Sequence, residues 1–463
     1  MKRWEQILQR REFMKWSLAG GATLLMSSTP GRLYSAIASS AKDPVQDYLL
    51  KYGPIDRTLG DHAPKQFFGD VNERPHKALW SLPQYLENRK IEGPIEEVPL
   101  VIVGGGVAGL FTAYTHRKQK PIVLEQALRL GGNAKGQSWR GLDYALGSAY
   151  IDEPHAGTPM DQFYKELNLD DFMVPRTVAD LVEYKGKLYR NFWDGETDPA
   201  EKEKYEKLAR FFTDITSEKE RPFPFIPSLN AGQLESLKYY DQWDLHALLS
   251  KVVGGKLPEQ LETAIEHYCW STYAGSAKEL SAPGALNFLA QEVRPIRIAA
   301  GGNARIAERL VERILKDVPR TNLRTSAIAL KVKVEANHVF VTYEDAEGKL
   351  RQIKAKAAVL SCPKFVVKRI LENIEPERSE KISKLRYRSY MTANLLINKK
   401  MEKQAYDVFM VGKGKTNFSD MKAAHDNVYT TDFVMGNYSD IKNTNVSVFT
   451  FFCAFPYDGV RAE

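Results

Sequence analysis

The chain is poor in the residues that build disulfide frameworks and metal sites. Its 463 residues include three cysteines, Cys269, Cys362 and Cys453, which lie far apart and form no CxxC pair. Eight histidines are scattered singly along the chain. This usage signals neither a disulfide scaffold nor a metal centre. We therefore expect all three thiols to be ordinary buried side chains.

Long hydrophobic runs and widespread excess charge are also lacking. The apolar run at residues 16–26 is about half as long as the roughly 20 residues that a membrane-spanning helix needs. The formal net charge is +7, but residues 1–38 contain six Lys or Arg against two Glu, which leaves +3 for the rest. No basic stripe is interleaved with aromatic residues. The sequence therefore predicts neither a nucleic-acid partner nor a stable membrane anchor.

The N-terminus has the layout of an export signal. A charged segment precedes the weakly apolar residues 16–26. Ala36-Ile37-Ala38 then places small residues at the two positions that a signal peptidase reads. We expect residues 1–38 to form a signal peptide that is cleaved after Ala38.

The charged part of this signal contains an arginine pair in a specific setting. The residues concerned are Arg10, Arg11, Phe13, Met14 and Lys15. They resemble a twin-arginine signal, and the resemblance implies the twin-arginine export machinery as a partner. It also implies folding in the cytoplasm around an enclosed cofactor, followed by a periplasmic or otherwise exported location. A general secretory signal and a retained N-terminal anchor are the alternatives.

A strand, a glycine loop and a helix follow one another directly after this lead-in. Residues 98–103 form a continuous apolar run, residues 104–109 read Gly-Gly-Gly-Val-Ala-Gly, and residues 110–119 have a helical pattern. A second apolar strand, residues 121–124, ends in Glu125. This order of elements is typical of a βαβ unit that binds an adenine dinucleotide.

The positions in this unit predict a role for each residue. Gly104 permits the tight turn, Gly106 lets the backbone approach a pyrophosphate, and Gly109 lets the helix lie close to the strand. The N-terminus of the helix offers N–H groups to the phosphates. Glu125 is placed to accept hydrogen bonds from the adenosine ribose. The predicted dinucleotide contacts in this unit are Gly104, Gly106, Val107, Ala108, Gly109 and Glu125.

A second glycine pair follows the ribose carboxylate within a few residues. It offers another place where backbone can approach a long dinucleotide, and it has a nearby arginine for the phosphates. The predicted contacts in this stretch are Gln126, Arg129, Gly131, Gly132 and Asn133. The βαβ unit alone leaves nicotinamide and flavin dinucleotides open, and the second glycine pair favours flavin.

Glu125, Arg129, Gly131 and Gly132 resemble the pattern of the flavin-containing amine oxidase superfamily. That superfamily includes monoamine and polyamine oxidases, phytoene desaturases and protoporphyrinogen oxidase. The resemblance covers about residues 97–400 and implies FAD as the cofactor. It also implies oxidation of a C–N or C–C bond of a small molecule by hydride transfer to the flavin. The alternatives are a desaturase or isomerase-type flavoenzyme, a nicotinamide-dependent enzyme, and an inactive flavin-binding remnant.

The resemblance also locates the adenine end of the cofactor and exposes departures from the family pattern. It implies that Ala327 or Ile328 contacts adenine, whereas Asn133 stands where the family usually has Arg. Residues 389–397 contain no Lys, although the amine-oxidising branch has one on this strand. No catalytic residue is therefore assigned. The family's closing Gly-Asp motif is also missing, so we expect a chain that is truncated or completed by a partner.

The order of elements predicts an α/β fold in which a Rossmann-like FAD-binding domain is assembled from two chain segments. A helical cap and a mixed-sheet substrate domain accompany it. The proline-rich lead-in is expected to be extended, with one short helix near residues 78–88. The predicted segments are the signal (1–38), the proline-rich extension (39–96), FAD-binding segments 1 and 2 (97–155 and 296–380), the helical cap (156–295) and an incomplete substrate-domain sheet (381–463).

Overall fold

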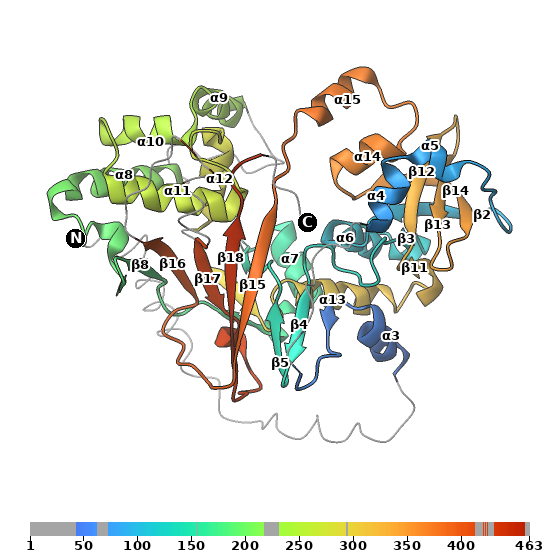
Figure 1. The fold of residues 1–463 in the computed structure, drawn as a ribbon, viewed down its shortest axis with the longest axis horizontal. Helices are drawn as coiled ribbons and strands as arrows, with labels where there is room; N and C mark the ends of the chain where they lie inside the picture. Colours follow the sequence, from blue (N-terminus) through green and yellow to red (C-terminus); the bar gives the residue numbers. More distant parts are fainter. Residues whose placement is uncertain are drawn as a thin grey trace.

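The computed structural model places two halves side by side (Figure 1). It describes residues 43–62, 73–154, 156–216, 231–292, 295–412, 420, 422, 424 and 430–458. The predicted export signal and its cleavage position lie outside these residues. One half contains the glycine-rich loops, and the other contains a second sheet with a group of helices above it. We call them the nucleotide-binding half and the cap half.

The nucleotide-binding half is built on a six-stranded sheet in the order β11-β3-β2-β14-β13-β12. The strands are β2 (Glu96–Val103), β3 (Ile122–Leu124), β11 (Leu323–Arg324), β12 (Ile328–Val334), β13 (Val339–Glu344) and β14 (Leu350–Leu360). The first four in spatial order are parallel, and β14, β13 and β12 form an antiparallel meander. Two segments about 200 residues apart in sequence thus share one sheet, which confirms the predicted α/β fold.

The centre of this sheet is apolar on both faces. The last four residues of β2, Leu100 to Val103, are all buried, as a continuous apolar run between two layers requires. On one face lie α6 (Val107–Thr115) and α13 (Ala304–Ile314), which share a core that includes Leu110 and Leu310. The helices α14 (Lys364–Ile370) and α15 (Pro376–Ser383) follow β14.

The lead-in differs from the extended segment that the prolines suggested. It forms α3 (Pro44–Tyr52), β1 (Ile55–Asp56), α4 (Glu73–Leu79) and α5 (Leu82–Leu86). Pro44 stands at the start of α3, where a proline loses no helical hydrogen bond, and the side chain of Asp43 caps the same helix. The expectation of a single short helix was wrong because these prolines open helices.

The cap half combines helices with strands that precede and follow these helices in the sequence. The helices are α8 (Lys202–Thr216), α9 (Ala231–Tyr240), α10 (Leu245–Val253), α11 (Glu259–Tyr273) and α12 (Ala282–Glu292). The preceding helix α7 (Pro159–Glu166) packs on α6 of the nucleotide-binding half, where Phe163 contacts Phe111. The large sheet of the cap half has the order β15-β18-β17-β16-β8-β9. The strands are β8 (Leu181–Tyr184), β9 (Lys187–Tyr189), β15 (Tyr390–Ile397), β16 (Asp407–Gly412), β17 (Asp432–Met435) and β18 (Ser447–Ala454). The segment predicted as a helical cap therefore also supplies strands to the sheet.

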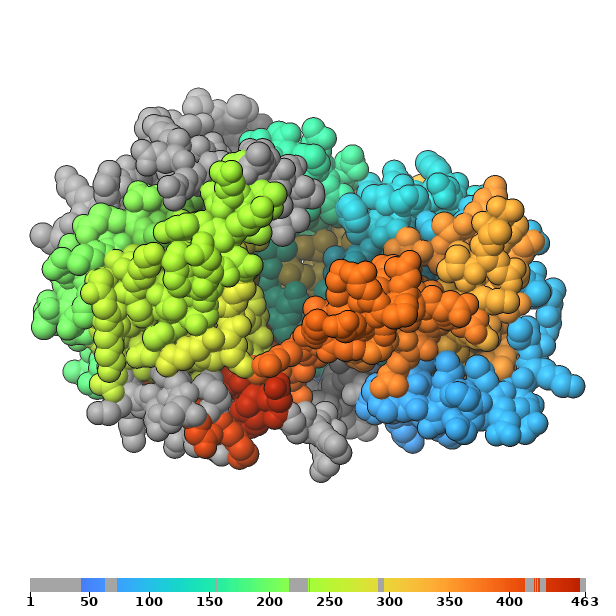
Figure 2. Space-filling model, turned by 90° about the horizontal axis from the view of Figure 1, so that it is seen from above, coloured from blue at the N-terminus to red at the C-terminus, as the bar shows by residue number. Residues whose placement is uncertain are grey.

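Small sheets connect the two halves. One contains β1, β4 (Gly136–Trp139) and β5 (Leu142–Ala145), and the other contains β6 (Tyr150–Asp152), β10 (Ile296–Ala299) and β7 (Met173–Pro175). Figure 2 shows a hollow between the cap helices and the orange α14–α15 region. Its floor has the colours that β4–β5 and α13 carry in Figure 1. Within the described part of the chain, no helix combines the length and apolarity needed to cross a membrane.

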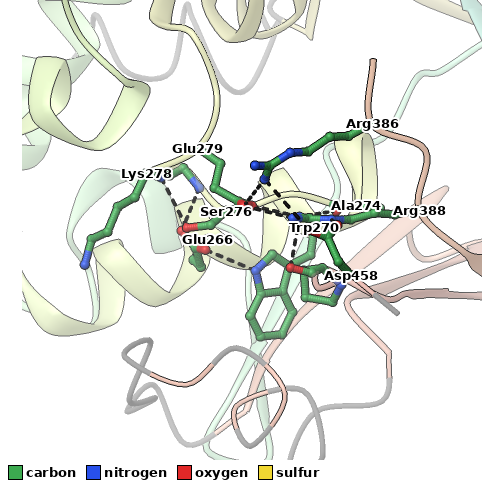
Figure 3. A network of polar contacts seen from close by, with 11 residues as sticks. Glu266, Trp270, Ala274, Ser276, Lys278, Glu279, Arg386, Arg388 and Asp458 are labelled. Atoms are coloured by element: carbon green, nitrogen blue, oxygen red, sulfur yellow. Dashed lines mark hydrogen bonds and ion pairs between the residues drawn. The ribbon is translucent and has the colours of Figure 1, made fainter. Parts of the chain in front are cut away.

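A polar network joins the cap to the segment that leads into β15 (Figure 3). Arg388 is its centre, with a side chain that is 9% exposed. Its guanidinium pairs with Glu279 at 2.7 Å and with Asp458 at 3.1 Å, and donates to the carbonyl of Ala274 at 3.0 Å. These residues are more than 60 positions away from Arg388 in sequence, so the network depends on the finished fold.

Candidate functional site

The two predicted glycine loops lie against each other. The backbone N–H of Gly131 donates to the carbonyl of Gly105 at 2.8 Å, and Gly106 forms a β-bridge with Gly131. One loop joins β2 to α6, and the other follows β3. The structure therefore brings together the residues that the sequence assigned to a dinucleotide.

Close backbone contact explains why glycine is needed at two of these positions. Gly132 has φ of +59°, and a Cβ atom there would lie 2.9 Å from the Cα of Gly106. A Cβ at Gly109 would lie 1.9 Å from the carbonyl oxygen of Gly104, so α6 packs directly on the turn. A side chain at Gly132 would fill the backbone cradle that a pyrophosphate approaches, and one at Gly109 would push α6 away from the turn.

The start of α6 suits a phosphate group. Gly106 occupies the N-cap position in extended conformation and provides no side-chain hydrogen bond to the helix. The first N–H groups of a helix have no partner within the helix, and they carry its positive end. Val107 and Ala108, the next predicted contacts, begin the helix here and are exposed. These residues fit the phosphates of FAD.

Glu125 ties the two glycine loops together. Its carboxylate accepts hydrogen bonds from the N–H of Gly105 at 2.7 Å and of Ala127 at 2.8 Å. The residue is only 7% exposed. An ionised carboxylate has about four lone-pair sites, so these two contacts are compatible with donation from ribose hydroxyls. The predicted ribose contact therefore fits the geometry, and Glu125 has a second role in shaping the loops.

Arg129, which the sequence assigned to the phosphates, contacts protein groups in the structure. Its guanidinium pairs with Asp56 at 2.8 Å and donates to the carbonyls of Leu50 and Gly53, each at 3.2 Å. Arg129 thus fastens the lead-in to the second glycine loop, and its phosphate contact stays a prediction. The neighbouring candidates Gln126 and Asn133 are exposed, and their cofactor contacts also stay predictions.

Ala327 and Ile328 lie beside the ribose carboxylate. The N–H of Ala327 donates to the carbonyl of Glu125 at 2.8 Å, and Ile328 begins β12. Both residues are buried, at 2% and 3% exposed. The structure thus places the predicted adenine segment next to the βαβ unit. Because the N–H of Ala327 is already used, an adenine contact by this group stays a prediction.

The lead-in contributes contacts to the site that the sequence did not reveal. The carbonyl of Tyr52 accepts from the N–H of Leu130 at 2.9 Å, and the carbonyl of Pro54 accepts from Gly136 at 3.1 Å. A Cβ at Gly131 would meet the side chain of Pro54 at 2.9 Å. No local pattern in a proline-rich stretch signals such contacts, because their partners lie about 80 residues further along the chain.

A buried ion cluster supports the floor of the site. Arg57 pairs with Glu308 on α13 at 2.5 Å and with Asp143 on β5 at 3.3 Å, and both carboxylates are 3% exposed. Burial alone would lower the pKa of Arg57, but hydrogen bonds and charge from Glu308 and Asp143 raise it overall. The cluster holds the lead-in, β5 and α13 in one arrangement.

The cap half approaches the glycine loops through β15. The hydroxyl of Thr392 on this strand donates to the carbonyl of Leu146 at 2.8 Å, just beyond β5. Tyr390, Met391 and Leu395 are exposed large hydrophobic residues on the same strand. The strand contains no Lys, and the geometry singles out no general acid or base. Catalytic residues remain unassigned.

The cysteines have the environments of unreactive thiols. Cys269 and Cys453 are buried as expected, whereas Cys362 is half-buried, so the expectation of three buried thiols was wrong for one. Burial raises the pKa of Cys362 to about 11, which keeps the sulfur protonated at neutral pH.

The protein has an α/β fold in which two glycine loops meet in an arrangement that suits an adenine dinucleotide. A family model described as flavin containing amine oxidoreductase matches residues 107–439, and the chain belongs to this family. FAD is accordingly its cofactor, and the nicotinamide alternative is not supported.

The relatives are distant in sequence. Oxidoreductase PigB of Serratia sp. is 22% identical over 400 residues, which cover 74% of this chain and 59% of that protein. The chain thus spans less than two thirds of the length of this curated relative. Among solved structures, a putrescine oxidase mutant has a TM-score of 0.57 at 14% identity, with 78% of this chain and 76% of that chain covered.

Two further solved structures have the same fold. A protein of Pyrococcus furiosus has a TM-score of 0.53 at 12% identity, with 77% of this chain and 80% of that chain covered. A fatty acid isomerase of P. acnes that produces CLA has a TM-score of 0.51 at 11% identity, with 77% of each chain covered. At these identities the likeness establishes the fold alone.

Proposed function

We propose that the protein is an exported FAD-dependent oxidoreductase that oxidises a C–N or C–C bond of a small molecule. The observation that carries the FAD part is the contact between the two glycine loops, with the buried carboxylate of Glu125 between them. Membership of the amine oxidoreductase family supports the oxidative chemistry. When bound, FAD accepts a hydride from a substrate C–H bond and passes the electrons to a further acceptor.

In this proposal the residues of the chain bind and orient the cofactor. The start of α6 and the cradle around Gly106 and Gly132 hold the pyrophosphate, and Glu125 orients the ribose. The strand β15, fixed by Thr392 to the loop after β5, forms the side of the site that faces the cap half. The apolar residues exposed on β15 favour a substrate with hydrocarbon character.

The bond that reacts is either a C–N or a C–C bond of the substrate. A titration under anaerobic conditions distinguishes these two alternatives, because substrate oxidation bleaches the visible absorption of the bound flavin. The probes are a panel of primary and secondary amines and a panel of unsaturated hydrocarbons and fatty acids. Bleaching of the flavin by the amines alone supports C–N oxidation. Bleaching of the flavin by the second panel, or isomerisation of its compounds, supports C–C chemistry. A protein that binds FAD and turns over neither panel would contradict the proposal and favour the inactive flavin-binding alternative.

Export by the twin-arginine route is the second part of the proposal. Arg10 and Arg11 precede the apolar run in the expected order, and a pathway for folded proteins suits a chain that encloses a cofactor. Replacing both residues by Lys should leave the uncleaved precursor in the cytoplasm of a bacterial host. The control variant carries Lys2→Gln and Arg3→Lys and should be exported normally. Normal processing of the first variant would contradict the twin-arginine assignment.

A further inference from the structure

The cap half contains an apolar pocket of about 180 Å³ that is partly open to solvent. Its walls come from the helices α8, α10, α11 and α12 and from the strands β8 and β16. Leucine, isoleucine and aromatic side chains dominate the lining, among them Leu249, Ile265, Phe212 and Phe409. Concave pockets lined mainly by apolar and aromatic side chains are typical ligand sites, so this pocket is a candidate binding site.

The size of the cavity limits what it can hold. An engineered cavity of about 150 Å³ lined by Leu, Ile and Phe stays dry and binds benzene. The space in the cap is somewhat larger and is lined by similar side chains. It matches one substituted aromatic ring or a short branched hydrocarbon group.

The charged residues in the lining already have protein partners. Arg176 forms an ion pair with Asp180, and Asp180 also accepts from the N–H of Asp407 at 3.2 Å. Arg190 donates to the carbonyls of Ala179 and Gln404, each at 2.9 Å. A charged ligand would have to break these contacts or be buried without a counter-charge. The occupant is therefore expected to carry no charge.

The cavity is separate from the glycine loops. Its strands β8 and β16 are divided from β15 by β17 and β18 in the sheet order, and it is β15 that contacts the loop after β5. None of its lining residues belongs to the dinucleotide site. The cavity is thus a feature of the cap rather than part of the cofactor site.

We propose that this cavity is a binding site for an uncharged hydrocarbon group of about one ring in size. The inference rests on the volume of the pocket, its apolar lining and the hydrogen bonds that already engage the charged residues around it. It does not depend on the redox activity of the protein.

The test measures binding of 4-fluorotoluene to the flavin-loaded, full-length protein by ¹⁹F NMR. The signal should shift or broaden saturably, whereas 4-fluorobenzoate and 4-fluorobenzylammonium should leave no saturable effect. In Ala209→Leu, the added side chain grows from a buried position in the cavity wall and should weaken binding by at least about tenfold. The matched control Arg210→Leu adds the same side chain at the next, exposed position of α8 and should bind like the original protein.

A second variant keeps the test decisive if Ala209→Leu disturbs the fold. Leu249→Ala enlarges the pocket and should strengthen binding of the larger 1-fluoronaphthalene relative to 4-fluorotoluene. Unchanged binding of 4-fluorotoluene in Ala209→Leu, together with unchanged binding of 1-fluoronaphthalene in Leu249→Ala, would overturn the proposal. Absence of saturable binding to the original protein, or equal binding of the charged probes, would overturn it as well.

Discussion

The glycine loops and the cap half differ in what fixes their geometry. The loops are shaped by backbone contacts between residues about 25 positions apart, such as Gly106 and Gly131. The cap is fixed by side chains that meet across the fold, such as Arg388 and Glu279, which are 109 positions apart (Figure 3). The contact between the glycine loops is thus local in sequence, although distant segments such as the lead-in hold it in place. The network around Arg388 in the cap, by contrast, joins residues far apart in the chain.

The packing of the two regions differs in the same way. Around Gly109 and Gly132 there is no room for a single added carbon atom. In the cap, aromatic and aliphatic side chains leave a pocket, and a Cβ at the exposed Gly284 would point into open space. The glycine loops therefore tolerate less change in side-chain volume than these positions of the cap.

The largest expected effect comes from placing the same extra carbon in each region. Gly109→Ala puts a Cβ 1.9 Å from a backbone oxygen, so it should lower the free energy of unfolding by about 3 kcal/mol or more and abolish FAD binding. Gly284→Ala in α12 is the matched control and should raise the free energy of unfolding by about 0.5–1 kcal/mol. Urea denaturation of both variants checks the difference, and equal effects would contradict it.

The next effect tests whether the lead-in is an integral part of the nucleotide-binding half. Arg57→Met removes the cation that Asp143 and Glu308 share. Glu308 keeps its ion pair with Arg305, but Asp143 loses its pairing with Arg57, so the free energy of unfolding should fall by about 3 kcal/mol. Lys118→Met removes an ion pair with Asp317 in which the lysine is 78% exposed, and it should cost less than about 1 kcal/mol. Similar denaturant midpoints for both variants would show that the lead-in is dispensable.

A smaller effect concerns the carboxylate between the glycine loops. Glu125→Ala removes an acceptor of charge-assisted hydrogen bonds worth about 1.5–3 kcal/mol each, so FAD should bind roughly tenfold to a hundredfold more weakly. Glu97→Ala is the control, because that residue is 72% exposed on β2 and pairs only at the surface with Lys354. Fluorescence titration with FAD measures both. An unchanged FAD affinity in Glu125→Ala would mean that Glu125 does not contact the ribose.

The smallest effect is a pH dependence in the cap. Hydrogen bonding to Arg388 lowers the pKa of Glu279 below its usual value of 4.5. A carboxylate with a lowered pKa in the folded state stabilises the fold above its unfolded pKa, and this stabilisation is lost as pH falls below about 4.5. Glu279→Gln should therefore reduce the loss of stability on acidification. The control Glu235→Gln, at an exposed position of α9, should leave it unchanged. Urea denaturation of both variants at neutral and acidic pH measures this loss of stability. An equal loss in Glu279→Gln and Glu235→Gln would contradict the role of the Glu279–Arg388 pair.

The sequence was sufficient to predict the nucleotide-binding strands and the positions of the two glycine loops, while their contact with each other is seen only in the structure. Apolar runs bounded by glycine, such as residues 98–103, report local burial directly, and the structure has β2 there. The order of elements also predicted that β14 would return to the same sheet as β2, because the intervening segment has a different pattern.

The rest of the site could not be predicted, since its contacts join distant residues. The ion pair of Arg129 with Asp56 in the lead-in had no signal in the sequence, and the phosphate contact of Arg129 stays a prediction. The helix at residues 44–52 was missed because Pro44 was interpreted as a breaker, although a proline in the first turn is compatible with a helix. Neither the cavity in the cap nor the network around Arg388 has a local signature in the sequence.

The most direct test of the central claim is a titration of the purified chain with FAD in the presence and absence of ADP. The contacts at the glycine loops address the adenosine diphosphate half of the cofactor, so FAD should bind with one site per chain and ADP should displace it competitively. Gly132→Ala, which closes the cradle against Gly106, should abolish both interactions while α12 and the cap stay folded. FAD binding that persists in Gly132→Ala, or that ADP does not compete with, would contradict a cofactor site between the two glycine loops.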